Sequence, residues 1–271
     1  FVSRTAERYN AILAGTQPPP LVAADLREVA EAELAYRAGS RFAADRAYWL
    51  DKVADLPAPV SLSGRTARWS EDDRFAGRQL PDRLTELLDR FAEDLQASPA
   101  QVVVAAFAAF LSRMTGADDV VLSMPVSGRV NRRLRNAFAM LANMVPIRFA
   151  VHPTTTVEQL VRASVAELVS AIRHQLYRFE DLRRDTNAMD PAANSFGPVV
   201  NILFFDSEIR LGSAVGRYRA LTSGALDDLQ LNLYRPGTEG PLLFELHGNA
   251  NLYTQDELEA HTTRFIAFLQ R

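Results

Sequence analysis

The chain has 271 residues, of which 48% are hydrophobic and 23% are charged, and its formal net charge at pH 7 is -3. This is the composition of an ordinary globular protein whose core needs no metal or disulfide, and the slightly negative charge argues against nucleic acid as the main partner. Cysteine is absent, which excludes disulfides, zinc–thiolate sites and cysteine nucleophiles. The longest apolar run, residues 102–111, is about half of what a membrane span needs, so we expect no membrane contact.

The first 60 residues carry helical patterns that then stop. Helices are predicted over residues 2–13, 24–38 and 41–54, and the first is ended by Gly15 and three consecutive prolines. Residues 56–73 have no helical period. We therefore predict two units, residues 1–60 and 61–271, with the boundary in this stretch.

The middle of the chain alternates helices with strands. Pro81 opens an amphipathic helix, and Ser98-Pro99-Ala100-Gln101 has the pattern of a capping box with proline in the first turn. The helix that follows is apolar nearly all round, which predicts burial on most sides. Strands are predicted over residues 119–126 and 143–151, and Thr155-Thr156-Val157-Glu158 predicts the start of a long helix.

The last third of the chain predicts three more strands and a closing helix. Residues 198–205 form an apolar run, while residues 228–234 alternate leucine with polar residues and should be half-buried. A turn leads from this strand into residues 242–248, which gives a hairpin, and Thr254-Gln255-Asp256-Glu257 caps the last helix. Helices interleaved with strands of mixed type predict a layered α/β fold with a mixed sheet.

Local motifs identify no catalytic nucleophile. The four histidines show no metal-ligand spacing, and G-x-S-x-G and phosphate-binding loops are absent. Surface or capping roles are expected for His174 and His261, a solvated turn for Asp118-Asp119, and a turn or strand edge for Asp227-Asp228. Asn143 begins an otherwise apolar strand, and its residue pattern fits a cleft-lining amide and a capping amide equally.

Several ordered segments resemble the condensation domain of nonribosomal peptide synthetases. The resemblance lies in SMPVSGR (123–129), LANMVPIR (141–148), RHQLYRFEDLRRD (173–185) and the connection between lobes (41–62). The stretches 196–206 and 223–234 resemble the variant found in siderophore-type synthetases. The family has a chloramphenicol-acetyltransferase-like fold of two layered lobes. The resemblance implies that residues 1–60 are the end of the N-terminal lobe and residues 61–271 the C-terminal lobe, with residues 228–234 as a latch between lobes and residues 212–227 near a tunnel floor.

The catalytic motif of that family, His-His-x-x-x-Asp-Gly, does not occur in the sequence. Residues 4–15 resemble the helix that follows the motif, so the resemblance places it upstream of Phe1 and assigns no catalytic residue to these 271 residues. The motif's aspartate forms a structural salt bridge in the family, and Arg129 is its expected partner. A buried guanidinium without an anion would be costly, which favours this pairing.

The resemblance implies formation of an amide bond between acyl or aminoacyl thioesters on two carrier proteins. Their phosphopantetheine arms would enter the tunnel, and the domain itself would bind no cofactor and no metal. The expected partners are upstream and downstream peptidyl carrier proteins, the rest of the N-terminal lobe and an adjacent adenylation domain, in the cytoplasm. The residues expected to line the tunnel are Ser123, Pro125, Asn143, Val145 and Asp228.

Two further hypotheses stay open from the sequence. The chain is compatible with a non-catalytic homologue that only docks carrier proteins, and with an epimerising or ester-forming member of the same superfamily. The sequence upstream of Phe1 would discriminate them, because an intact His-His motif there favours the transferase.

Overall fold

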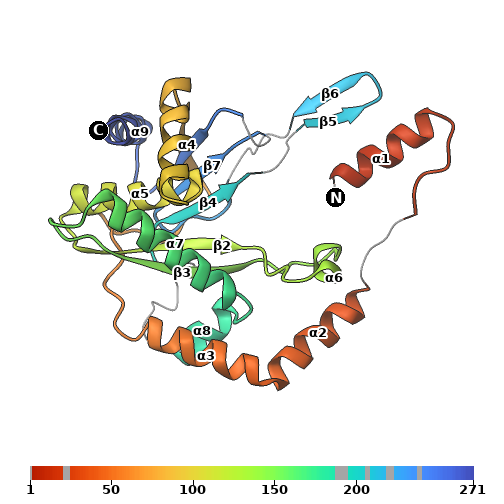
Figure 1. Ribbon diagram of the computed structural model, residues 1–271, viewed down its shortest axis with the longest axis horizontal. Coiled ribbons are helices and arrows are strands. Elements are labelled where there is room, and N and C mark those ends of the chain that lie inside the picture. Colours follow the sequence, from red (N-terminus) through yellow and green to blue (C-terminus); the bar gives the residue numbers. More distant parts are fainter. Residues whose placement is uncertain (1, 21–24, 187–194, 205–207, 218–222, 237–239) are drawn as a thin grey trace.

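The computed structural model describes residues 2–20, 25–186, 195–204, 208–217, 223–236 and 240–271 (Figure 1). The helices within these residues are α1 (Val2–Leu13), α2 (Leu26–Ala38), α3 (Ser40–Lys52), α4 (Asp82–Asp94), α5 (Pro99–Thr115), α6 (Arg132–Arg135), α7 (Val157–Arg173), α8 (Phe179–Asp185) and α9 (Gln255–Leu269). The strands are β1 (Asp73–Gln79), β2 (Asp119–Val126), β3 (Asn143–Ala150), β4 (Val199–Leu203), β5 (Glu208–Leu211), β6 (Ala214–Arg217), β7 (Leu229–Tyr234) and β8 (Leu243–Asn249).

A mixed sheet is the centre of the fold. Its strand order is β1-β8-β7-β4-β2-β3, in which β4 runs parallel to both β2 and β7 while the other neighbours are antiparallel. The predicted hairpin is confirmed as the antiparallel pair β7–β8. The prediction of a layered α/β fold with a mixed sheet is therefore confirmed.

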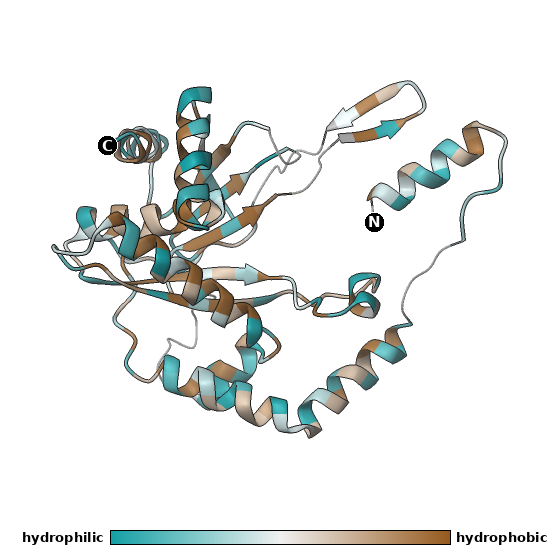
Figure 2. Cartoon of the chain, in the orientation of Figure 1, coloured by the Kyte–Doolittle hydropathy of each residue, from teal (hydrophilic) through white to brown (hydrophobic). Residues whose placement is uncertain are grey.

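Helices α5, α7 and α9 pack against one face of this sheet, and α4 packs on α5. The side chains between the layers are almost completely buried, and Figure 2 shows hydrophobic residues on the central strands. The largest of them include Phe107, Leu122, Phe149, Phe244 and Phe265. Burying such side chains contributes roughly 1.5–3 kcal/mol each, so this interface is the main source of stability.

Three long helices begin with capping boxes, as the sequence predicts. Ser98 pairs with Gln101, and Thr254 pairs with Glu257. At α7 the box differs by one residue from the prediction, because Thr156 is the cap and its partner is Gln159 rather than Glu158. The third helical residue must reach back to the cap's backbone N–H, and Gln159 occupies that position.

The amino-terminal helices contact separate parts of the chain. Asn10 of α1 donates from Nδ2 to the carbonyl of Arg210 (2.8 Å) and accepts from the N–H of Gly212 (2.7 Å), so α1 lies on the β5–β6 hairpin (Figure 1). Helix α3 packs against α8. Neither a helix nor a paired strand interrupts the described residues between Lys52 and Asp73, apart from a bridge at Ser70. The division at residue 60 stays a prediction.

Some features differ from the sequence-based expectations. Residues 228–234, for which the resemblance implies a latch between lobes, form β7, which lies between β8 and β4 inside the sheet; the latch role stays a prediction. The strand was also expected to be half-buried, yet Gln230 (8% exposed) and Asn232 (2% exposed) are buried as well as its leucines. Strand β1 and the hairpin β5–β6 were not predicted. Part of the stretch expected near the tunnel floor, residues 218–222, lies outside the described residues.

Across the described ranges, no single helix is long and apolar enough to cross a membrane; α4 and α5 together reach that length but are bent by 101°.

Candidate functional site

Three of the sequence motifs meet at one edge of the sheet, where β2 ends and β3 begins. After β2 the chain turns at Gly128, whose φ of +63° suits glycine and whose N–H donates to Oε1 of Gln175 (3.0 Å). A Cβ at this position would lie 2.1 Å from the carbonyl oxygen of Leu141, so the close approach of the two backbones requires glycine. This contact joins the segment 123–129 to the segment 141–148 and to the segment 173–185.

Asn143 connects the same three segments through its amide. Its Nδ2 donates to the carbonyls of Gln175 (2.9 Å) and Tyr177 (2.7 Å), and its Oδ1 accepts from the N–H of Phe179 (2.8 Å). The residue is 7% exposed. Both N–H donors are therefore used by the backbone of the α7–α8 connection, so the amide holds this connection on the edge of the sheet. Of the two interpretations left open by the sequence, the geometry favours the capping amide.

Arg129 follows the glycine turn and is half-buried. Its Nη1 donates to the carbonyls of Leu134 (2.6 Å) and Ala137 (2.9 Å), and its Nη2 donates to that of Ala139 (3.0 Å). Carbonyls of the loop around α6 accept from three of the five N–H donors of this guanidinium, and the expected salt bridge of Arg129 to an aspartate stays a prediction. Within the described residues Arg129 therefore organises that loop.

A second cluster ties the α7–α8 connection to the amino-terminal helices. His174 ends α7, and its Nδ1 lies 2.7 Å from Oδ1 of Asp45, whose Oδ2 accepts from the hydroxyl of Tyr36 (2.9 Å). The imidazole stacks on Tyr48, and the indole of Trp49 donates to the carbonyl of His174 (2.8 Å). Burial and the neighbouring Asp45 raise the pKa of Tyr36, which keeps its hydroxyl a donor. His174 occupies the C-cap position of α7, but its imidazole contacts Asp45 and Tyr48 rather than the end of the helix.

The sheet face opposite the helices carries a polar network, and sequence reasoning missed it. Register pairs Phe75 with His247, His247 with Gln230 and Gln230 with Val199, so these residues share one face. His247 is 3% exposed; its Nδ1 lies 2.6 Å from Oδ2 of Asp73 and its Nε2 lies 3.3 Å from Oε2 of Glu245.

The network continues along β7. The hydroxyl of Tyr234 donates to Oε2 of Glu245 (2.8 Å), Asn232 donates to that hydroxyl (3.2 Å), and Gln230 donates to Oδ1 of Asn232 (2.7 Å). Burial disfavours the charged form of His247, but hydrogen bonds to the two carboxylates and their charges outweigh this, so the pKa of His247 is raised. The alternating polar positions of β7 and β8 were the signal in the sequence that could have revealed this network.

Asp228 lies on the same face of the sheet as this network, at the end where β2 and β7 begin. Its Oδ1 accepts from the hydroxyls of Ser61 (2.8 Å) and Tyr253 (2.8 Å), while its Oδ2 is buried without a described partner. Burial raises the pKa of Asp228 despite these two hydrogen bonds. This carboxyl group connects the 57–72 segment to the β7–β8 hairpin.

The five residues expected to line a tunnel do not share one surface. Ser123 pairs with Pro146 and Pro125 with Met144, while Val145 pairs with Met124 and Asn143 with Val126. Because neighbours in a strand alternate between faces, Ser123 and Pro125 lie on the polar side and Asn143 and Val145 on the helical side. Ser123 is fully buried, and its Oγ accepts from the N–H of Phe196 (2.7 Å). The lining role of the set stays a prediction.

Two other expectations about ionisable residues change. His261, expected at the surface or as a cap, is 7% exposed, and burial lowers its pKa. Asp119 of the pair Asp118-Asp119 was expected in a solvated turn, but it begins β2 and accepts from Nε (3.0 Å) and Nη2 (2.6 Å) of Arg148. Among the described residues, no three His, Cys, Asp or Glu are grouped as a metal site.

The chain matches known proteins throughout its length. The family model described as "Condensation domain" matches residues 1–271. The chain is 31% identical over 270 residues to a dimodular nonribosomal peptide synthase of Bacillus subtilis (strain 168), covering 100% of this chain and 11% of that protein. It is 33% identical over 257 residues to an isonitrile lipopeptide synthase of Streptomyces coeruleorubidus, covering 95% of this chain and 18% of that protein.

Solved structures show the same similarity. The first condensation domain of the calcium-dependent antibiotic synthetase, in complex with a substrate analogue, matches with a TM-score of 0.88 and 36% identity, covering 99% of this chain and 59% of that one. The starter condensation domain of rhizomide synthetase matches with a TM-score of 0.88 and 29% identity, covering 99% and 60%. The chain thus spans about three fifths of these domains and under a fifth of the synthases named above. Three findings show that the chain belongs to the condensation-domain family: the match over its full length, the similarity of its fold to solved condensation domains, and the motifs that meet at the sheet edge.

Proposed function

We propose that this chain works as part of a domain that forms amide bonds between carrier-bound thioesters. In this reaction the acceptor amine attacks the carbonyl carbon of the donor thioester. The C–N bond forms, the C–S bond breaks, and the thiol of the donor's phosphopantetheine arm leaves with a proton while the amine loses one. Both arms are substrates delivered by carrier proteins.

The observation that carries this proposal is the junction at Gly128, Asn143 and Gln175. It joins three segments that resemble the family's motifs, in a chain that the family model matches over residues 1–271. The junction fixes where β2 ends relative to the α7–α8 connection. A fixed backbone at this place is what a transferase needs in order to hold two substrates in register.

In this proposal the chain's own residues line the tunnel and hold the catalytic motif in place, and they do not supply the base. The sequence contains no His-His-x-x-x-Asp-Gly, so in this proposal that motif comes from outside the 271 residues. Arg129 has two N–H donors, on Nε and Nη2, that are not taken up by the three loop carbonyls. A carboxylate can accept from both, so these donors support the proposed salt bridge to the motif's aspartate.

A single-turnover assay with two loaded carrier proteins tests the proposal. We expect product from a protein extended upstream through the His-His motif, and none from the 271 residues alone. Product from the 271 residues at the rate of the extended protein would overturn the assignment of the base. Carrier-protein binding by the extended protein without any product would instead support the hypothesis of a non-catalytic docking homologue.

A further inference from the structure

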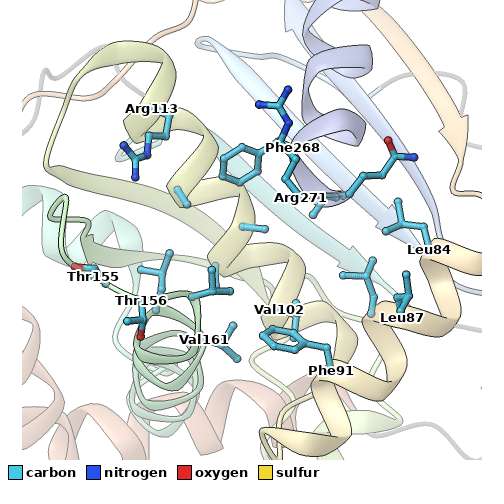
Figure 3. Close-up of a pocket in the computed structure, with 18 of the residues that line it drawn as sticks. Leu84, Leu87, Phe91, Val102, Arg113, Thr155, Thr156, Val161, Phe268 and Arg271 are labelled. Carbon is cyan, nitrogen blue, oxygen red and sulfur yellow. The ribbon is translucent and has the colours of Figure 1, made fainter.

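An apolar groove of about 880 Å³ lies on the helical layer, on the other side of the sheet from the polar network (Figure 3). It is bordered by α4, α5, the start of α7 and the end of α9. Its apolar lining includes Leu84, Leu87, Phe91, Val102, Val161 and Phe268. Figure 3 shows these side chains directed into one trough between the helices.

Helix α5 forms the floor of the groove, and its small side chains leave space above it. Ala105, Ala106 and Ala109 line it between Val102 and Arg113. Eleven residues of helix extend about 17 Å, which equals about three helical turns. On the walls, Leu87 is 48% exposed and Val157 is 65% exposed. Large apolar side chains left exposed around a trough are typical of a binding surface.

The charged side chains of the rim are of one sign, although the carboxyl end of α9 also borders the groove. The charged side chains among the described lining residues are arginines, with His152 beside them, and no Asp or Glu side chain is among these lining residues. Arg83 on α4 and Arg113 at the end of α5 are both exposed, and neither makes an ion pair with another described residue. The amino terminus of α7, at Thr156, borders the same groove and adds a partial positive charge.

We propose that this groove binds an amphipathic α-helix of a protein partner, with an apolar stripe facing α5 and carboxylates facing Arg83 and Arg113. The apolar trough matches the way helices dock into grooves through residues at i, i+4 and i+7. The two arginines lie on different helices, so they are complemented by a ligand with several separated carboxylates rather than by an acyl chain with one anionic end.

The partner would not occupy the amide-forming site. None of the junction residues Gly128, Asn143 and Gln175 lines the groove. Binding at the groove and the chemistry proposed above therefore concern different surfaces. A failure of one proposal leaves the other intact.

The test uses the full protein and a fluorescein-labelled 15-residue peptide with leucines at i, i+4, i+7 and i+11 and glutamates on the flanks. Fluorescence anisotropy measures its dissociation constant, and a second peptide has lysine in place of each glutamate. We expect the acidic peptide to bind at least tenfold more tightly than the basic one. Raising the salt concentration should weaken binding of the acidic peptide, since exposed charges are screened.

Matched variants locate the binding on the groove. Arg83→Glu and Arg113→Glu should each weaken binding of the acidic peptide about tenfold, and Ala109→Trp should weaken it further by filling the floor. Arg90→Glu, on α4 but outside the lining, is the control and should change binding less than twofold. Circular dichroism and the melting temperature confirm that each variant is folded.

Three outcomes would overturn the proposal. Equal binding of the acidic and basic peptides would remove the role of the rim arginines. Binding of dodecanoate, lost in Ala109→Trp, without binding of the peptide would identify an acyl-chain site. Self-association in sedimentation velocity that is lost in Ala109→Trp would identify a second copy of the chain as the occupant.

Discussion

Replacing Asn143 by alanine should destabilise the protein strongly, although the residue belongs to a motif expected at the reaction tunnel. The substitution removes three hydrogen bonds, to Gln175, Tyr177 and Phe179, at a position that is 7% exposed. An unsatisfied buried partner costs roughly 1–3 kcal/mol. Three such partners, with some relaxation of the α7–α8 connection, give an expected loss of about 3–5 kcal/mol in the free energy of unfolding.

Urea unfolding followed by tryptophan fluorescence measures this loss. Trp49 is a suitable reporter, because its indole donates to the carbonyl of His174 beside the affected connection. Asn143→Asp should cost at least as much, since a carboxylate oxygen would replace the donating nitrogen and face two carbonyls. Asn131→Ala, which removes one part-buried hydrogen bond that Oδ1 accepts from the N–H of Leu134, is the control. A loss below about 1 kcal/mol for Asn143→Ala, with reduced amide formation, would refute the structural role and restore the tunnel-lining one.

Three further predictions concern charged side chains. The pKa of His247 is raised, so its stabilising contribution is present below about pH 6.5 and is lost as the pH rises through the pKa of His247 in the folded protein. His247→Gln should abolish this fall in stability, measured by thermal melts across pH 6–9. Arg129→Ala should lower the free energy of unfolding by about 2–4 kcal/mol, because three carbonyls lose a charged donor, whereas the exposed Arg132→Ala should change it by less than about 1 kcal/mol in the same urea assay. Asp89→Ala should cost about 3 kcal/mol by leaving the buried guanidinium of Arg235 without its bidentate partner, and unchanged urea midpoints would contradict this.

Elements with strong local signals could be predicted from the sequence. The capping box at Ser98 and the left-handed Gly116 bound α5 as expected, and the apolar run of β2 forms a buried strand. These features depend on interactions within a few residues. The hairpin β7–β8 was also predictable, since its two strands alternate and are joined by a glycine-rich turn.

Features that depend on distant partners could not be predicted in the same way. Strand β1, with sequence DRFAGRQ, has little apolar pattern and owes its strand conformation to pairing with β8. The role of Asn143 required knowing that residues 175–179 return to the edge of the sheet. Likewise, the carbonyls that bind Arg129 belong to an irregular loop whose path no periodicity describes.

The two faces of the sheet carry polar residues with different kinds of partner. A sheet needs one apolar face against helices, and Leu229, Leu231 and Leu233 provide it on β7. Asn143 lies on that side and bonds only to backbone groups, so its amide is committed to the fold. His247 lies on the other side and bonds to carboxylates, so the stability that this arrangement contributes depends on the protonation of its imidazole. Because both ring nitrogens of His247 lie against carboxylates, a change of pH should alter the polar network on this face while the amide of Asn143 keeps its backbone partners.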